Sequence, residues 1–181
     1  APVSGGIAGV EAGTLAVMAG GAATHLERAT EAMRGYAGNV THMGPSGTGQ
    51  ATKLCNQTIV ATTVVAIAEA IGFAQRNGID IDKLAAAFTG GWADSKPLQV
   101  FAPRMIRTQA QSIGALQTML KDVDNVLAAA QKSGAPMPVT GGVQQVLRIA
   151  GAMGLGEAEL SAVISVMLPE RREEFLRQAG H

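Results

Sequence analysis

The chain has 181 residues, of which 47% are apolar and 15% charged, and its 14 basic and 14 acidic side chains leave no formal net charge. This composition excludes a disordered chain, which needs low hydrophobicity and high charge. The zero net charge argues against binding nucleic acid through its phosphates. Aromatic residues make up only 3%, so the core must consist of small aliphatic side chains, which suit closely packed helices.

The first 43 residues alternate short apolar runs with glycines, a pattern typical of α/β structure. We expect strands at residues 1–3, 14–18 and 39–43, a glycine-punctuated loop over 5–13, and a helix over 22–36. Two or three strands leave edges and apolar faces exposed, so they do not make a stable α/β domain alone. The mismatch predicts that this part is a remnant of a larger domain.

From about residue 49 the pattern becomes helical. A long helix is predicted over 50–76, closed by a left-handed cap at Gly78. Shorter helices are predicted over 80–88, 97–107, 116–133 and 137–153, and one or two over 158–177, broken by Pro169. The most apolar run, 58–74, is slightly short for a membrane span and contains Glu69, which favours a buried helix. The fold class is therefore mainly α, with a small α/β part in front.

A glycine-rich loop, Gly44-Pro-Ser-Gly-Thr-Gly49, leads into the long helix and carries the most specific chemical signal. Glycines permit tight turns and close ligand approach, and a helix N-terminus favours negative charge. Lys53 lies in the first turns, with Asn56 and Gln57 at i+3 and i+4 on the same face. The helix dipole and burial would both lower the pKa of this lysine towards the range useful for general acid/base catalysis. The pattern alone is equally compatible with a surface lysine near a helix start.

This Gly-x-x-Gly-x-Gly-x-x-x-Lys segment resembles the catalytic helix of the β-hydroxyacid dehydrogenases, which include 3-hydroxyisobutyrate dehydrogenase and tartronate semialdehyde reductase. Further segments resemble other signatures of that family in the same order: residues 1–6 with 13–15, Leu120-Lys121-Asp122, and Gly154-Leu155-Gly156 followed by Ser161. The resemblance implies an all-helical 6-phosphogluconate dehydrogenase-like C-terminal domain over 46–181, preceded by a Rossmann remnant over 1–45.

The resemblance also implies roles for individual residues. Lys53 would be the catalytic general acid/base of a hydride transfer that uses NAD or NADP. The substrate, a small hydroxy acid or aldehyde acid, would be bound by a set of six residues, and Lys121 would contact the cofactor. The six substrate-binding residues are Ser4, Gly5, Gly6, Asn56, Gln57 and Asp122.

The sequence departs from the family pattern at three places. The family commonly has Asn four residues after the lysine, where this chain has Gln57, so we interpret Asn56 as the contact. Gly114 replaces a phenylalanine that often covers the substrate, and Trp92 either fills that space or packs in the core. No Gly-x-Gly-x-x-Gly is present. We therefore expect this chain alone to be inactive and to bind no dinucleotide tightly.

The remaining expectations are of lower specificity. Single Cys55 fits a reducing, cytoplasmic location and a packed, inert thiol. Three histidines at 25, 42 and 181 have no ligand-spaced partners, so no metal site is expected. We expect no nucleic-acid or membrane partner, and a homodimer or higher homo-oligomer formed through the helix 50–76. Two alternatives stay open: a non-catalytic helical dimerisation or scaffold domain, and an imine-reductase-like member of the same architecture.

Overall fold

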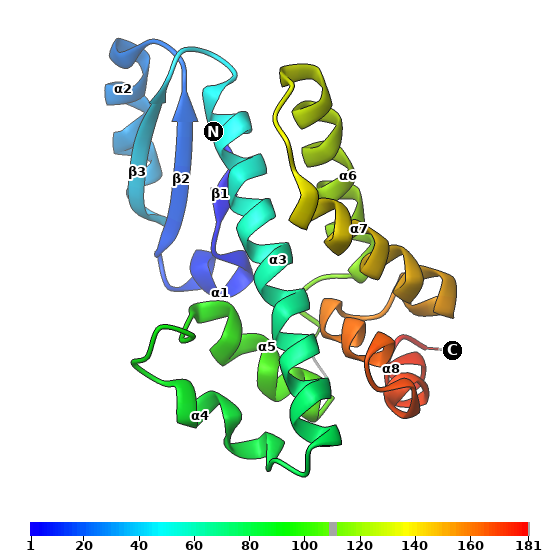
Figure 1. Cartoon of the computed structure of the whole chain (residues 1–181). Helices are drawn as coiled ribbons and strands as arrows, with labels where there is room; N and C mark the ends of the chain where they lie inside the picture. The colour runs from blue at the N-terminus through cyan, green and yellow to red at the C-terminus, as the bar shows by residue number, and fades with distance from the viewer. Residues whose placement is uncertain (109–111, 181) are drawn as a thin grey trace. The chain divides into compact units, whose positions relative to one another are not determined.

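A computed structural model describes residues 1–108 and 112–180 (Figure 1). The chain divides into two compact units, Ala1–Gln57 and Thr58–His181, called here the N-terminal unit and the helical unit. The division falls within one continuous helix, α3, and the predicted domain boundary after residue 45 stays a prediction.

The N-terminal unit is a three-stranded sheet with helices, in the order β1 (Val3–Ser4), α1 (Gly6–Glu11), β2 (Leu15–Gly20), α2 (Ala23–Met33), β3 (Ala37–Gly44) and the start of α3 (Thr48–Arg76). The sheet order is β1-β2-β3, with β1 antiparallel and β3 parallel to β2 (Figure 1). The central strand, β2, is the most buried of the three, because β1 and β3 pair with its two edges. Val17 of β2, for example, is only 2% exposed. The three predicted strands are confirmed.

One local prediction was wrong. Residues 5–13 contain a short helix, α1, instead of a continuous loop. The glycines at the two ends do adopt positive φ, at Gly5, Gly6 and Gly13, but Gly9 lies inside the helix. A Cβ at Gly9 would lie 2.8 Å from Leu15 Cδ2, so this glycine allows α1 to pack closely on β2.

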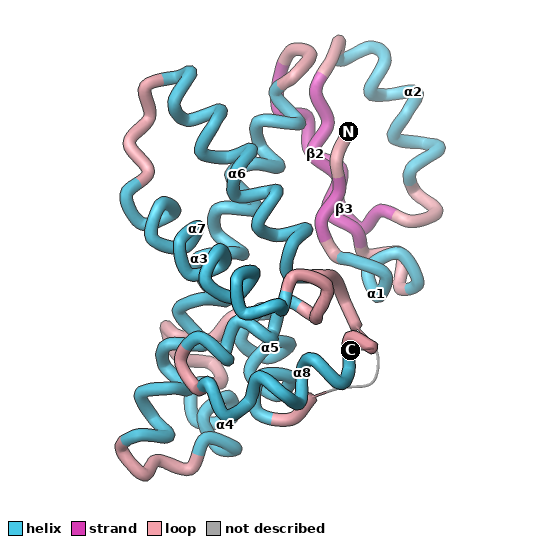
Figure 2. Tube along the Cα trace, turned by 90° about the vertical axis from the view of Figure 1, so that its right-hand side faces the viewer, coloured by secondary structure: helices cyan, strands magenta, loops and turns pink. Residues whose placement is uncertain are grey.

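The helical unit is built from the remainder of α3 and from shorter helices around it. These are η1 (Ile81–Lys83), α4 (Leu84–Phe88), α5 (Lys96–Ile106), α6 (Leu116–Ser133), α7 (Pro138–Ala150), η2 (Gly151–Leu155), η3 (Leu160–Val166), η4 (Pro169–Arg171) and α8 (Arg172–Gln178). Helices α6 and α7 lie side by side in both views, joined by a turn in which Gly134 has φ 72° (Figures 1 and 2). This confirms the predicted stop at Gly134.

The core of the helical unit contains small aliphatic side chains from every major helix, as the composition predicted. Val64, Ala68, Ala102, Val123 and Leu147 are all completely buried. α3 is the one helix in the described part of the chain that is long and apolar enough to cross a membrane. Core helices pass the same test, and half of its most apolar window is buried inside the protein.

The segment after Gly156 differs from the prediction of one or two regular helices. Residues 160–166 form a 3-10 helix, and only Arg172–Gln178 is α-helical. Every residue from Leu160 to Ser165 is buried. A segment that is buried on all sides has no amphipathic face, so the surrounding packing sets its conformation and the periodicity predicts it poorly.

Candidate functional site

The glycine loop is shaped so that the start of α3 lies directly against the sheet. Gly44 and Gly47 have φ of 119° and 95°, a region that L-residues rarely adopt. Thr48 Oγ1 donates to the Pro45 carbonyl at 2.7 Å and closes the turn. Gly49 is buried, and a Cβ there would lie 2.9 Å from the Gly20 amide and overlap the Met18 carbonyl. Only glycine permits this contact.

The contact of Gly49 with the sheet sets the position of Lys53. It lies four residues after Gly49, so helical geometry places both on the same face of α3, which faces the sheet. Its Nζ donates a hydrogen bond of 2.9 Å to the main-chain carbonyl of Val3, in strand β1. The lysine that the sequence singled out is therefore held beside the segment Ser4 to Gly6, fifty residues away in the chain.

The predicted carboxylate-binding segment has an unusual backbone. Ser4 is half-buried and pairs with Ala16 of β2. Gly5 and Gly6 have φ of 138° and 62°, and both are exposed. A Cβ at Gly6 would meet nothing within 4 Å, so the main chain there is open to an approaching ligand.

Asn56 and Gln57 lie one turn beyond Lys53. Asn56 is half-buried, and its Nδ2 donates to Gln57 Oε1 at 2.9 Å. Gln57 is 9% exposed. The structure thus brings Lys53, the Ser4–Gly6 segment and this amide pair together in the N-terminal unit, while the substrate role of each stays a prediction.

Lys121 and Asp122 belong to the helical unit. Both lie in the second turn of α6, where Lys121 is exposed and Asp122 half-buried. They are adjacent in sequence, so they point in different directions around the helix. Their predicted roles towards cofactor and substrate stay predictions.

The expectation for Cys55 was wrong, and so was one of the two alternatives for Trp92. Trp92 does not pack in the core of the described residues; it is fully exposed on the loop between α4 and α5. Cys55 is exposed and not packed, because its position on α3 points away from the sheet-facing side that Lys53 occupies. Gly114 has φ 150° and lies just before α6.

The histidines do not cluster. His42 Nε2 lies 2.8 Å from the Gly21 carbonyl, His25 is exposed, and His181 lies outside the described residues. Within residues 1–108 and 112–180, no group of three His, Cys, Asp or Glu side chains could hold a metal ion.

Three side chains of the helical unit have clearly shifted pKa values. The pKa of Asp94 is lowered by hydrogen bonds from the Gln99 side chain and the Gly90 amide. The pKa of Asp80 is lowered, and that of Lys83 raised, by their mutual hydrogen bond and ion pair of 2.9 Å. These groups stabilise turns on either side of α4.

Sequence reasoning missed one buried ionic network. Glu159, whose side chain is 1% exposed, pairs with Arg104 at 2.8 Å and accepts a hydrogen bond from Ser161. The available signal was a carboxylate in an otherwise apolar run, between Ala158 and Leu160. Its partner lies 55 residues away, so the sequence did not reveal the pairing.

Two protein families match almost the whole chain. Residues 1–44 match the NAD binding domain of 6-phosphogluconate dehydrogenase, and residues 47–167 match the family described as NAD-binding of NADP-dependent 3-hydroxyisobutyrate dehydrogenase. The chain belongs to the β-hydroxyacid dehydrogenase family. This confirms the resemblance and the mainly helical fold with a small α/β part in front.

Individual relatives agree with this assignment. The chain is 33% identical over 167 residues to 2-hydroxy-3-oxopropionate reductase from Escherichia coli, covering 92% of this chain and 57% of that protein. It is also 33% identical to NAD-dependent L-serine dehydrogenase from Pseudomonas aeruginosa, covering 93% and 59%. This family member therefore spans less than two thirds of the length of these curated relatives.

Solved structures give the same fold. The 3-hydroxyisobutyrate dehydrogenase of Salmonella typhimurium is similar with a TM-score of 0.85 and 26% identity, over 91% of this chain and 58% of that one. The Mycobacterium tuberculosis 3-hydroxyisobutyrate dehydrogenase with L-serine is similar with a TM-score of 0.81 and 29% identity, over 92% and 59%.

Proposed function

We propose that the whole protein transfers a hydride between NAD or NADP and a small hydroxy acid of the 3-hydroxyisobutyrate or tartronate semialdehyde/glycerate type, with Lys53 as general acid/base. The observation that carries this proposal is the 2.9 Å hydrogen bond from Lys53 Nζ to the Val3 carbonyl. It fixes an amine close to the open main chain of Gly6, where a substrate carboxylate has room to bind. The names of the relatives supply the substrate class.

The N-terminal unit has open main chain at the edge of the sheet where a dinucleotide cofactor would bind. In open α/β sheets, ligands bind outside the carboxyl ends of parallel strands. The carboxyl ends of β2 and β3 continue into Gly21 and into the loop with Gly47, and a Cβ at either glycine would meet nothing within 4 Å. When bound, the nicotinamide would donate or accept the hydride. Lys121 would contribute a positive charge towards the cofactor from the helical unit.

The proposed steps of this chain's own residues concern orientation and one proton. Ser4 Oγ and the amides of Gly5 and Gly6 hold the substrate carboxylate. Lys53 Nζ removes the proton from the substrate hydroxyl during oxidation and returns it during reduction. Asn56 orients the substrate or the lysine through its amide. Asp122 contributes a further polar contact from α6.

Replacing Lys53 tests this function. Lys53→Ala in the whole protein should reduce kcat by about 10²–10⁴-fold, because a positioned general acid/base contributes that much. Circular dichroism should show an unchanged fold. The matched control is Lys132→Ala, an exposed lysine in the last turn of α6, which should keep parental turnover. Near-parental kcat in Lys53→Ala would rule out the lysine mechanism, whereas a parent protein that transfers no hydride would favour the scaffold alternative.

We also infer that the partner of this chain is a second copy, bound through the exposed stripe of α3 at Ile59, Ala66 and Phe73. These residues recur every seven positions, and Ile59 and Phe73 are each 67% exposed. Hollows of about 250 and 460 Å³ flank Phe73, towards Met167 and towards α4.

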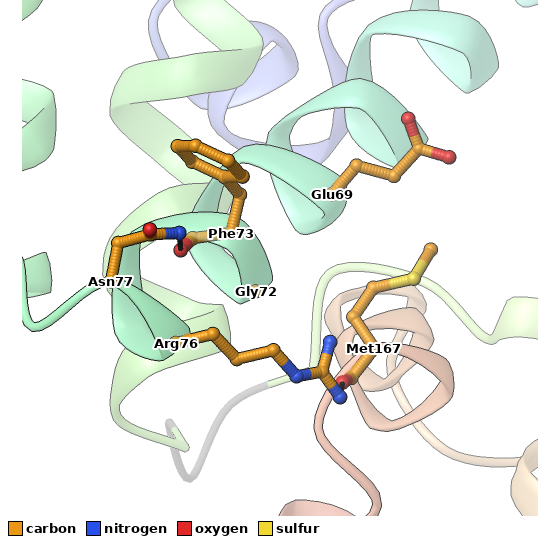
Figure 3. A pocket seen from close by; sticks show the side chains of 6 residues that line it. All are labelled: Glu69, Gly72, Phe73, Arg76, Asn77 and Met167. Atoms are coloured by element: carbon orange, nitrogen blue, oxygen red, sulfur yellow. Dashed lines mark hydrogen bonds between the residues drawn. The ribbon is translucent and has the colours of Figure 1, made fainter.

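The charges on this stripe favour self-association. Glu69 and Arg76 lie on one edge of α3, at equal distances along the helix on either side of a point between residues 72 and 73 (Figure 3). In a two-fold antiparallel pair, Glu69 would face Arg76 of the second copy, and both Phe73 rings would meet near the axis. Ile59 would lie about 20 Å along the helix from this axis, so α3 would meet α3 only at the Phe73 end of the stripe. Arg76 already donates to the Met167 carbonyl at 2.8 Å, which leaves other guanidinium donors available.

A further inference from the structure

The start of α6 is capped by a distant segment of the chain and not by its own side chains. The N-cap residue, Ala115, offers no side-chain acceptor. Instead the amides of Leu116 and Gln117 donate to the carbonyls of Ala158 and Gly156, at 2.8 and 2.9 Å. In return the Leu160 amide donates to the Gly114 carbonyl at 3.0 Å. Residues 156–161, called here the strap, thus hold the first turn of α6.

The strap is itself fixed by one buried carboxylate. Glu159 lies opposite Ala115 in the antiparallel bridge between the two segments. Its Oε1 accepts from Arg104 Nη1 at 2.8 Å, and its Oε2 accepts from Ser161 Oγ at 3.1 Å. Arg104 comes from α5 and is 17% exposed. The network therefore joins α5, the strap and the start of α6.

Stability alone does not account for this pair. Removing two charges from water is costly, and a pair of apolar side chains of similar volume often stabilises a core equally well or better. What an ion pair provides, and an apolar pair does not, is direction. Two bonds to separate oxygens of Glu159 fix the position of the strap and, through the Gly156 and Ala158 carbonyls, the position of α6.

We propose that Glu159, with Arg104, is a positioning residue that sets where Lys121 and Asp122 lie. Lys121 is one turn beyond Gln117, whose amide bonds Gly156 and whose side chain donates to Glu157 at 2.6 Å. A shift or rotation of the strap moves this turn of α6 directly. The proposal rests on the proposed function, because it assigns the network to the cofactor and substrate contacts of the same site.

The test replaces both charges at once. The variant Arg104→Met/Glu159→Met should unfold close to the parental temperature, because the gain from an apolar pair is offset by the buried Ser161 hydroxyl, which loses its acceptor. Hydrogen exchange at the amides of residues 116–122 should speed up about tenfold, because the anchor is no longer directional. In the whole protein KM should rise about tenfold, with kcat within about twofold, since binding residues move and the proton-transfer residue does not.

A matched control removes a different ion pair of the same helix. Asp124 of α6 pairs with Arg148 of α7 at 3.3 Å, and both are about half exposed. Arg148→Met should leave both the exchange of residues 116–122 and KM at parental values.

Each outcome is decisive. Parental exchange in the double variant would show that the network fixes nothing, and faster exchange with parental KM would overturn the positioning role. If the parent protein transfers no hydride from any small hydroxy acid, the proposed function fails. The exchange at Lys121 and Asp122 then still decides whether the network fixes this turn.

Discussion

Gly49→Ala is the most informative change in the N-terminal unit, because it adds one methyl group where two backbone segments touch. The new Cβ would lie 2.9 Å from the Gly20 amide and would overlap the Met18 carbonyl, whereas ordinary contacts begin at 3.4 Å. Both neighbours are main-chain atoms of β2, so neither can rotate away. The start of α3 must therefore move off the sheet, by on the order of 1 Å.

Two opposing terms set the size of the effect on stability. Overpacking costs about 1–3 kcal/mol, and the upper end applies because the obstacle is backbone. Alanine recovers up to about 1 kcal/mol of helix propensity relative to glycine. The expected net loss in the free energy of unfolding of the N-terminal unit is about 2 kcal/mol. Because Lys53 lies one turn along the same face, kcat of the whole protein should fall about 100-fold.

Urea denaturation and amide exchange of residues 15–19 measure the first effect, and steady-state kinetics measures the second. The matched control is Gly142→Ala in α7, where a Cβ meets nothing within 4 Å. This control should be stabilised by up to about 1 kcal/mol. Gly49→Ala with parental exchange in β2 and parental kcat would refute the idea that this close contact positions Lys53.

Three further predictions concern other parts of the chain. Asp94→Asn should lower the melting temperature at pH 7, because folding depresses the pKa of Asp94. The ionised carboxylate therefore stabilises the fold above the pKa of the unfolded state, and this stabilisation is lost as the pH falls through the pKa of the folded state. The difference in melting temperature from the parent should vanish at low pH. Calorimetry of the 181-residue chain with NADH and NADPH should give Kd values weaker than about 1 mM, and tight binding would contradict this. Phe73→Asp should convert a dimer to a monomer in light scattering, whereas Ile149→Asp, at an equally apolar exposed position, should not; a dimeric Phe73→Asp variant would exclude the proposed stripe.

The sequence predicted those elements that have one buried apolar face, or that contain a residue type required by the backbone conformation. Helix α6 shows its buried side at Leu116 and Val123, and Gly134 closes it because the left-handed cap needs glycine. The buried strand β2 is similarly apparent from its apolar run. These features depend on neighbours within about ten residues, which is the range that a local pattern reports.

The contacts that depend on distant parts of the chain were not predictable. Lys53 donates to a main-chain carbonyl, which every residue type carries, so the residue at position 3 gives no sign of this hydrogen bond. The pairing of Glu159 with Arg104 spans 55 residues. Trp92 was expected either to cover the substrate or to pack in the core, yet the course of a loop leaves it fully exposed. Roles for Ser4 and the other site residues came from family resemblance and not from periodicity.

The main-chain acceptor of Lys53 has a consequence for how this site tolerates mutation. Every amino acid brings the same carbonyl, so no substitution of Val3 deletes the partner of the lysine. The side chain at position 3 is 38% exposed and free to change in size or polarity without losing that bond. The anchoring of the Lys53 amine is thus uncoupled from the side chains around it, and mutation can reshape the neighbouring surface while the amine keeps its place.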